Sequence, residues 1–144
     1  MSLKEILESA RERGDFSAFV DAIPYARFLG LTVRREGESL ITTMTFSPML
    51  VGNATIPALH GGTIGGLVES AAVFQLLYEA DQLVLPKIIN VTVDYLRSAR
   101  AVDTHATGII TKQGRRVTSV RAVAWQEDRD KPIATASAHY LVGA

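Results

Sequence analysis

The sequence predicts an α+β fold in which one long buried helix is wrapped by a curved six-stranded antiparallel sheet. A single long apolar segment with helical character lies near the middle of the chain. Six segments with the period-two pattern of strands flank it, two before and four after. The helix is apolar nearly all round, so it needs cover on more than one side, and a curling sheet supplies that cover.

Short helices are predicted for the first part of the chain, residues 1–23. Ser2 with Glu5 three residues later forms the capping-box pattern of a helix start, and Asp15 is placed to cap a second helix. The second helix must end near Pro24, because the residue before a proline avoids helical backbone angles. We therefore predict an N-terminal helical extension ahead of the sheet.

The strand segments are rich in β-branched and aromatic residues and are separated by turn residues. Short turns follow the first, fourth and fifth strands, so these strands pair with their successors as antiparallel hairpins. Both faces of the last strand carry apolar side chains, which predicts an oligomer of at least two chains. The predicted strands are 31–33, 40–46, 88–96, 105–112, 117–126 and 133–142, and the predicted helix is 63–78.

Composition narrows the classes of function. The 144 residues fit one domain, 1–144, and 15 basic against 15 acidic residues leave no net charge to attract a nucleic acid. The absence of cysteine excludes disulfides, thiolate metal sites and cysteine nucleophiles. No apolar run is long enough to span a membrane and the charged start does not match a secretion signal, so we expect a cytoplasmic protein.

One charged side chain, Glu69, interrupts the long apolar helix. A carboxylate that leaves water without a partner is destabilised by several kcal/mol. Carboxylates in such surroundings gather at active sites, which makes Glu69 a candidate catalytic residue. The alternative is a helix with one side that reaches solvent.

His60, Gly61 and Gly62 stand just before the predicted helix. The unpaired N–H groups of a helix N-terminus are donors for a developing oxyanion, and glycines let a substrate carbonyl approach the backbone. The glycines recur at Gly65 and Gly66, a spacing that also suits close packing of the helix against another backbone. At this point both roles stay open.

Gly61 and Glu69 are eight residues apart, which is about 12 Å along a helix. They therefore cannot both touch one reacting carbonyl within a chain. If a two-fold axis sets two copies of the helix side by side and antiparallel, Glu69 of one chain lies near Gly61 of the other. We expect two such sites per homodimer, either alone or in a homotetramer that is a dimer of dimers.

Four segments of the chain occur in a recognisable order: PYARFLG at 24–30, HGG at 60–62 with Glu69, VTVDYLRSA at 91–99 and GRRV at 114–117. Together they resemble hotdog-fold acyl-CoA thioesterases of the phenylacetate-degradation (PaaI-like) type, over about residues 20–142. The resemblance implies a hotdog fold and the hydrolysis of acyl-CoA to free acid and coenzyme A. It implies no cofactor, since coenzyme A belongs to the substrate.

The resemblance also implies roles for individual residues. Glu69 would act as general base on water or as nucleophile, the Gly61 N–H would bind the thioester oxygen, and His60 would orient the carbonyl or the leaving thiolate. Asn53 is the nearest amide that could complete the site, at a spacing one residue longer than the family pattern. The residues expected to bind substrate, the arginines through coenzyme A phosphates, are Gly62, Ser70, Val73, Ile88, Thr92, Arg97, Arg115 and Arg116.

The chain departs from this family at two positions. Family members often carry a hydroxyl four residues after the acid or early in the next strand, where it holds the attacking water. Val73 and Ile88 stand there in this chain, and Ser70 and Thr92 are substitutes by proximity only. The missing hydroxyl is compatible with direct attack by Glu69, with a slow or narrow activity, or with loss of hydrolysis.

Two rival functions stay open. A hydroxyacyl dehydratase on the same fold uses a histidine and an acid for proton transfer, and forms an alkene in place of a free thiol. A non-catalytic acyl-CoA binding module would bind without turnover. A metal site is not predicted, because the three histidines, His60, His105 and His139, show no metal-like pairing.

Overall fold

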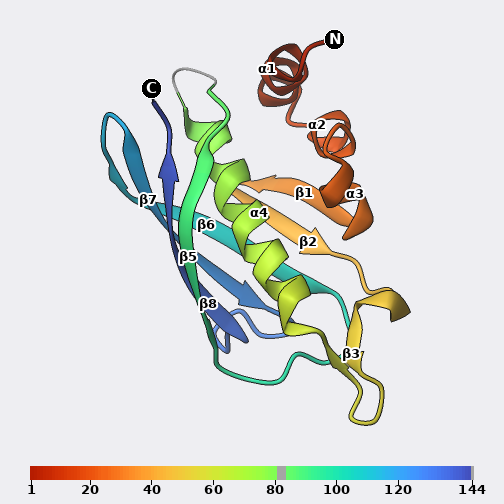
Figure 1. Ribbon diagram of the computed structural model, residues 1–144. Coiled ribbons are helices and arrows are strands. Elements are labelled where there is room, and N and C mark those ends of the chain that lie inside the picture. Colours follow the sequence, from red (N-terminus) through yellow and green to blue (C-terminus); the bar gives the residue numbers. More distant parts are fainter. Residues whose placement is uncertain (81–83, 144) are drawn as a thin grey trace.

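A computed structural model describes residues 1–80 and 84–143 of the chain. It confirms the predicted fold class: a six-stranded antiparallel sheet curves around one long helix, α4 (Gly61–Glu79), as Figure 1 shows. The helix begins two residues before the predicted start at residue 63. Among the described residues, no helix has the length and apolar character needed to cross a membrane.

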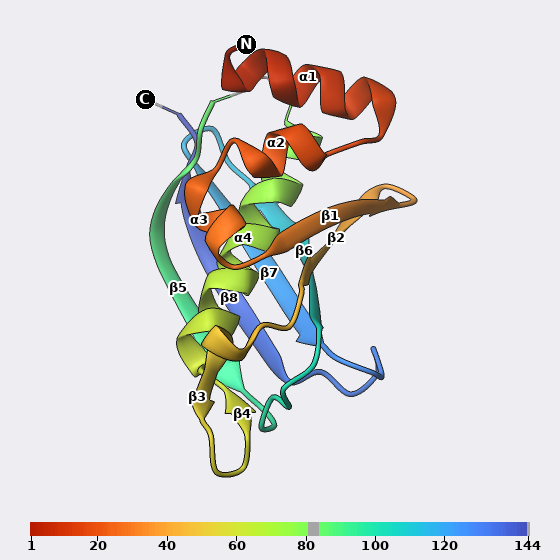
Figure 2. The ribbon, with the colours of Figure 1, turned by 90° about the vertical axis from the view of Figure 1, so that its right-hand side faces the viewer.

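Three short helices precede the sheet: α1 (Leu3–Arg13), α2 (Ser17–Asp21) and α3 (Pro24–Phe28). The predicted cap of α1 is confirmed, since the Ser2 hydroxyl accepts a hydrogen bond from the Glu5 N–H at 3.2 Å. Pro24 was expected only to end a helix, but it also begins one, because a proline suits the first helical position. Figure 2 shows α1 and α2 beyond the C-terminal end of α4.

The main sheet has the strand order β1-β2-β6-β7-β8-β5, and every neighbouring pair is antiparallel. The hairpins β1–β2, β6–β7 and β7–β8 match the prediction. The strand β5 is the next strand after α4 in the sequence, yet within the described residues it pairs only with β8 and forms an edge of the sheet. The strands are β1 (Leu31–Glu36), β2 (Ser39–Met44), β5 (Lys87–Tyr95), β6 (Thr104–Gln113), β7 (Val117–Trp125) and β8 (Ala134–Leu141).

A second, two-stranded sheet leads into α4. It consists of β3 (Val51–Asn53) and β4 (Ala58–Leu59) and follows a single 3-10 turn, η1 (Pro48–Leu50). The sequence predicts this stretch only as irregular chain, because strands of two or three residues carry no readable alternation. The hairpin places the chain entry to α4 beside β3.

The core lies between α4 and the concave face of the sheet. Small side chains let the helix lie directly on the strands: a Cβ at Gly108 of β6 would stand 3.0 Å from the Cα of Ala72. Towards the end of α4, Phe74 packs edge-to-face against Phe19 of α2, with ring centroids 5.6 Å apart. The N-terminal helices therefore cover part of the C-terminal half of α4 on a side that the sheet does not reach.

Gln75 ties α4 to the β1–β2 hairpin. Its buried side-chain oxygen accepts a hydrogen bond from the Leu40 N–H at 2.8 Å, and its side-chain nitrogen donates to the Glu38 carbonyl and the Glu79 carboxylate. Both ends of a buried amide are thus satisfied. The contact fixes the start of β2 against the last turns of the helix.

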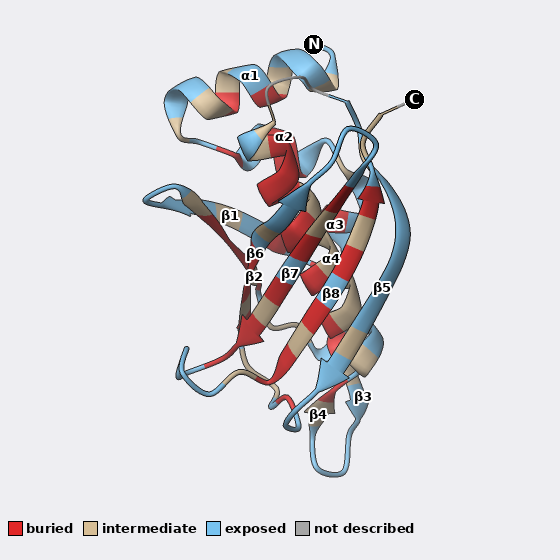
Figure 3. Ribbon diagram, turned by 90° about the vertical axis from the view of Figure 1, so that its left-hand side faces the viewer, coloured by how far each residue is buried: buried red, intermediate tan, exposed pale blue. Residues whose placement is uncertain are grey.

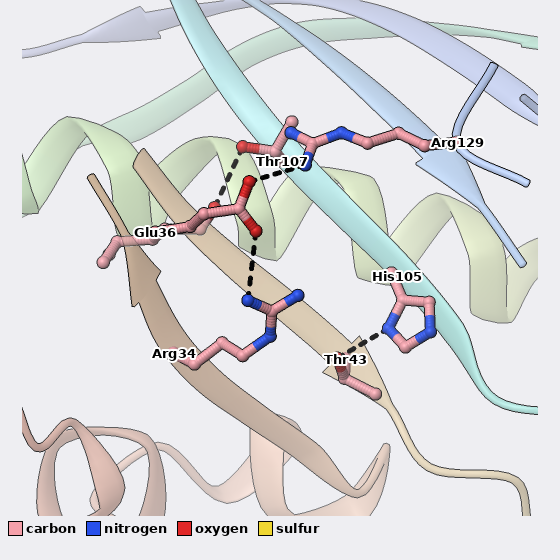
Figure 4. A network of polar contacts seen from close by, with 7 residues as sticks. Arg34, Glu36, Thr43, His105, Thr107 and Arg129 are labelled. Carbon is pink, nitrogen blue, oxygen red and sulfur yellow. Dashed lines mark hydrogen bonds and ion pairs between the residues drawn. The ribbon is translucent and has the colours of Figure 1, made fainter. Parts of the chain in front are cut away.

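A polar network covers the outer face of the sheet near β1, β2 and β6, as Figure 4 shows. Glu36 accepts hydrogen bonds from Arg34 at 3.1 Å and from Arg129 at 2.9 Å, and these bonds hold the pKa of its carboxyl below the usual value. Thr43 and His105 are joined by a hydrogen bond of 2.8 Å. The charged groups are exposed, so the network contributes little to stability and mainly joins neighbouring segments.

Candidate active site

The N-terminus of α4 is built around His60. Its N–H donates to the Leu50 carbonyl at 2.8 Å, and its imidazole lies against Gly52, where a Cβ would stand 2.8 Å from the His60 Cα. The Nδ1 atom accepts a hydrogen bond from the Gly62 N–H at 2.9 Å and so caps the helix. In the neutral ring the proton is therefore on Nε2, which is left as a donor.

Gly61 is the first residue of α4 and is half-buried. Its N–H makes no hydrogen bond with any residue that the structure describes. The next N–H, that of Gly62, is already taken by His60. Gly61 therefore offers a donor for an anionic oxygen at the positive end of the helix dipole.

Glu69 lies two turns further along α4 and is half-buried. Its carboxylate forms no ion pair or hydrogen bond with another residue within 1–80 and 84–143. Its backbone carbonyl accepts a hydrogen bond from the Tyr140 hydroxyl at 3.1 Å. A carboxylate in this position is available to take a proton from water, and its backbone is held in place.

The half-buried side of α4 collects small residues around this carboxylate. Gly61, Gly65, Glu69 and Val73 recur every fourth residue, so they share one side of the helix, and Ser70 lies next to it. This side packs less completely than the buried opposite side. Val73 stands where the family often has a hydroxyl, and Ser70 carries the hydroxyl next to Glu69 in the sequence.

The other candidates lie on β3 and β5, and none of them is hydrogen-bonded to Glu69 within the described residues. Asn53 is exposed at the end of β3, where its side chain accepts from the Thr55 N–H at 2.9 Å. Ile88 is exposed near the start of the edge strand β5. Thr92 lies on the face of β5 opposite to Val93, which packs against the core, so its hydroxyl is directed away from α4.

A hollow of about 420 Å³ lies beside Gly61. Its lining combines the start of α4 with Tyr95 at the end of β5 and the chain that follows, including Arg97. Arg97 also borders a second hollow of about 280 Å³, together with Arg100 and Lys131. A basic group thus stands at the rim of the space next to the Gly61 donor.

Arg115 and Arg116 lie at the other end of the molecule. They belong to the β6–β7 turn, which Figure 1 shows at the same end of the molecule as the end of α4 and at the opposite end from β3. The adjoining residues Gln113 and Gly114 line a hollow with Leu76 of α4. Within one chain, therefore, the two predicted groups of arginines do not meet.

Two contacts that the sequence did not predict involve tyrosines. The Tyr95 hydroxyl donates to the Gly61 carbonyl at 2.8 Å, and the Tyr140 hydroxyl donates to the Glu69 carbonyl. Strand alternation places both residues on the helix side of the sheet. Strand alternation does not predict which turn of α4 each tyrosine contacts, so only the folded structure shows which helix carbonyl each hydroxyl binds.

No group of three or more His, Asp or Glu side chains within the described residues is arranged to hold a metal ion. The chemistry that the site offers is that of a carboxylate, an imidazole and a backbone N–H. These groups suit acid–base catalysis with stabilisation of an oxyanion.

Comparison with known proteins assigns the family. The model of the acyl-CoA thioesterase N-terminal domain matches residues 51–141. The medium/long-chain acyl-CoA thioesterase YigI of Salmonella typhimurium is 32% identical over 140 residues, which cover 87% of this chain and 89% of that protein.

Solved structures agree with the fold. A protein from Chromobacterium violaceum is 39% identical with a TM-score of 0.78, over 94% of this chain and 95% of that one. A phenylacetic acid degradation-related protein from Ralstonia eutropha shares the fold at 21% identity, with a TM-score of 0.75 over 88% and 98% of the two chains. The chain belongs to the acyl-CoA thioesterases and has their hotdog fold.

Proposed function

We propose that this thioesterase acts on medium or long acyl chains, with Glu69 as general base, the Gly61 N–H as oxyanion donor and a second copy of the chain completing the site. The half-buried Glu69 carboxylate, without a partner among the described residues, carries the proposal. The acyl length rests on the YigI relatives, which are medium/long-chain acyl-CoA thioesterases. Coenzyme A enters as part of the substrate, and the reaction uses no cofactor.

The chemistry is a hydrolysis with a tetrahedral intermediate. Glu69 takes a proton from water while the water oxygen bonds to the thioester carbon, and the carbonyl oxygen becomes an oxyanion that the Gly61 N–H binds. Collapse of the intermediate breaks the C–S bond, and the departing sulfur takes up the proton that Glu69 held. His60 Nε2–H is the donor placed to orient the carbonyl or the thiolate.

The edge of the sheet supports a site shared between two chains. Figure 3 shows β5 exposed along almost all of its length, and its outer edge is paired with no strand among the described residues. Ile89 and Val91 are exposed on this strand, which is unusual for an isolated chain. A second copy that pairs antiparallel with β5 extends the sheet and sets the two α4 helices antiparallel, with Glu69 opposite the partner's Gly61.

The same arrangement gives a role to the separated arginines. In an antiparallel pair, the Arg115–Arg116 end of one chain approaches the Gly61 end of the other. Arg97 at the rim of the 420 Å³ hollow then joins them around the coenzyme A phosphates. Binding through such exposed charges weakens as salt is added.

The first test is release of free thiol from aromatic and aliphatic acyl-CoA thioesters of increasing chain length. The Glu69→Gln variant should lose about 100- to 10,000-fold in kcat, because it keeps the size of the side chain and loses the base. Glu79→Gln, on the same helix, is the matched control and should keep wild-type rates. An undiminished rate for Glu69→Gln contradicts the proposal, and an alkene product without free thiol indicates a dehydratase.

The second test mixes two inactive variants. Gly61→Pro removes the N–H without disturbing α4, because proline is tolerated at the first helical position and His60 already has an extended backbone, with ψ of 129°. If the site is shared, re-equilibrated mixtures of Gly61→Pro with Glu69→Gln regain about a quarter of wild-type activity, since each mixed dimer contains one intact site. No recovery means that each chain acts alone.

A further inference from the structure

Two tyrosine hydroxyls bind the backbone of α4 at the residues to which we assign chemistry. Tyr95, at the end of β5, donates to the Gly61 carbonyl at 2.8 Å. Tyr140, on β8, donates to the Glu69 carbonyl at 3.1 Å. The other two tyrosines, Tyr25 and Tyr78, donate no side-chain hydrogen bond to any residue that the structure describes.

Tyr140 is buried in the core, where its hydroxyl remains a hydrogen-bond donor. Its side chain is 0% exposed, and it follows Ala134, Ala136 and Ala138 on the helix side of β8. The alanines let α4 lie close to the strand, and the longer phenol spans the gap to Glu69. Burial raises the pKa of Tyr140 well above its ordinary value, and the negative charge of Glu69 raises it further, so the hydroxyl remains protonated.

Tyr95 holds the first turn from the outside. It is 54% exposed, and its ring lies against the helix backbone where glycines leave room. A Cβ at Gly61 would stand 3.4 Å from the ring, and one at Gly65 would stand 3.7 Å from the hydroxyl. The phenol therefore contacts the same turn whose N–H is free to bind the oxyanion.

The N-terminal half of α4 needs such anchors. Its four glycines, at positions 61, 62, 65 and 66, give the backbone more freedom than any other residue would, and helix ends fray. Each anchored carbonyl belongs to one of the two reacting residues. A shift of about 1 Å in either group is enough to lower a catalytic rate about 100-fold.

We propose that Tyr95 and Tyr140 are positioning residues that fix Gly61 and Glu69 on α4 for the reaction. The proposal rests on the catalytic roles proposed above for these two residues. The tyrosines act through the backbone and do not touch the reacting atoms. They should therefore affect the rate of the chemical step more than the binding of substrate.

The test compares Tyr95→Phe and Tyr140→Phe with the control Tyr78→Phe, which removes a hydroxyl from the end of the same helix. Steady-state kinetics are measured at a temperature below the melting of every variant, so that loss of folded protein does not enter. Each positioning variant should lose about 10- to 100-fold in kcat, with KM within about twofold of wild type. Tyr78→Phe should match wild type in both constants.

Unchanged kcat in both positioning variants overturns the proposal, as does an equal loss in Tyr78→Phe. A melting temperature that falls while kcat stays at the wild-type value indicates a purely structural role and also overturns it. If Tyr140→Phe does not fold, Tyr95→Phe decides alone, because its ring is more than half exposed. If Glu69→Gln retains activity, the catalytic assignment fails first, whatever the tyrosine variants do.

Discussion

The two halves of α4 differ in their surroundings. Along residues 61–70, the side that carries Glu69 is half-buried, and the contacts across it are made by tyrosine hydroxyls and glycine backbone. Along residues 71–79, large side chains such as Phe74 and Leu77 are buried against the sheet and α2. One continuous helix thus combines a half that is incompletely covered with a half that holds the core together.

If Glu69 and Gly61 act as proposed, this difference separates the stabilising part of α4 from its catalytic part. A helix packed on all sides for its whole length would leave no room for substrate at Glu69, and a glycine-rich helix alone would be a poor scaffold. The buried second half supplies the packing that holds the first half in place. Substitutions in the two halves should therefore affect different measurements.

Phe74→Ala should have the largest effect on stability. It removes a ring that is 3% exposed and packs on Phe19, so the free energy of unfolding should fall by about 3–5 kcal/mol in urea denaturation. Ser70→Ala, one turn earlier, is the matched control and should change it by no more than about 0.5 kcal/mol. A loss below about 1 kcal/mol for Phe74→Ala would mean that this half of α4 is not the main anchor.

Gly65→Ala should change the stability of the single chain and the activity of the proposed dimer in opposite directions. Its Cβ would meet only the Tyr95 hydroxyl at 3.7 Å, an ordinary contact, so helix propensity should stabilise the chain by about 1 kcal/mol. The same Cβ would stand on the side of α4 proposed to face the second copy, and the rate of thiol release should fall at least about tenfold. Full activity in this variant argues against close contact between helices.

Gly66→Ala is the matched comparison. Its Cβ would stand 3.0 Å from the Tyr25 hydroxyl and 3.1 Å from Leu29, so the variant should be less stable than wild type. Adjacent glycines should therefore respond with opposite signs in urea denaturation. Equal responses would mean that crowding by the N-terminal helices does not decide the outcome.

The smallest expected effect is a pH dependence of stability that comes from His105 on the outer face of the sheet. Burial lowers the pKa of His105 below its usual value of 6.5, with Arg34 acting in the same direction and Asp103 opposing it. The folded state thus favours the neutral ring, so its contribution is complete above pH 6.5 and is lost as the pH falls through the lowered pKa. We expect a decrease of less than about 1 kcal/mol in unfolding free energy.

His105→Gln should remove this decrease, when unfolding is compared between pH 7 and pH 5. The control His139→Gln changes a histidine that is hydrogen-bonded to Asn90 on β5, and it should retain the decrease. The same acid-induced loss in all three proteins would assign it to other groups.

Periodicity was sufficient to predict the large elements of the fold but not the small ones. The strands of the main sheet and α4 are long enough for their alternation to be read, and they lie close to the predicted ranges. By contrast, α3 has five residues and starts at Pro24, and β4 has only two residues. Their conformation depends on contacts with the rest of the molecule, which a local pattern does not contain.

The candidate site divides in the same way. Glu69 and Gly61 were identifiable because a lone acid in an apolar helix and a glycine at its start are local features. The contact of Tyr140 with Glu69 was not, because the two residues are distant in the sequence and only the packing of β8 on α4 brings them together. The structure places Arg115 and Arg116 at the opposite end of the molecule from Gly61. Only a second copy of the chain would bring arginines of this end close to Gly61.

The position of β5 in the sheet has a consequence for folding during synthesis. This strand leaves the ribosome soon after α4, but the strand with which it pairs in the described part of the chain, β8, follows β6 and β7 in the sequence. At about 5–20 residues per second, β5 waits several seconds before it can pair. Its exposed edge is therefore complete only once β8 has been added, and the pairing with a second copy that we propose would begin only after the sheet of each chain is complete.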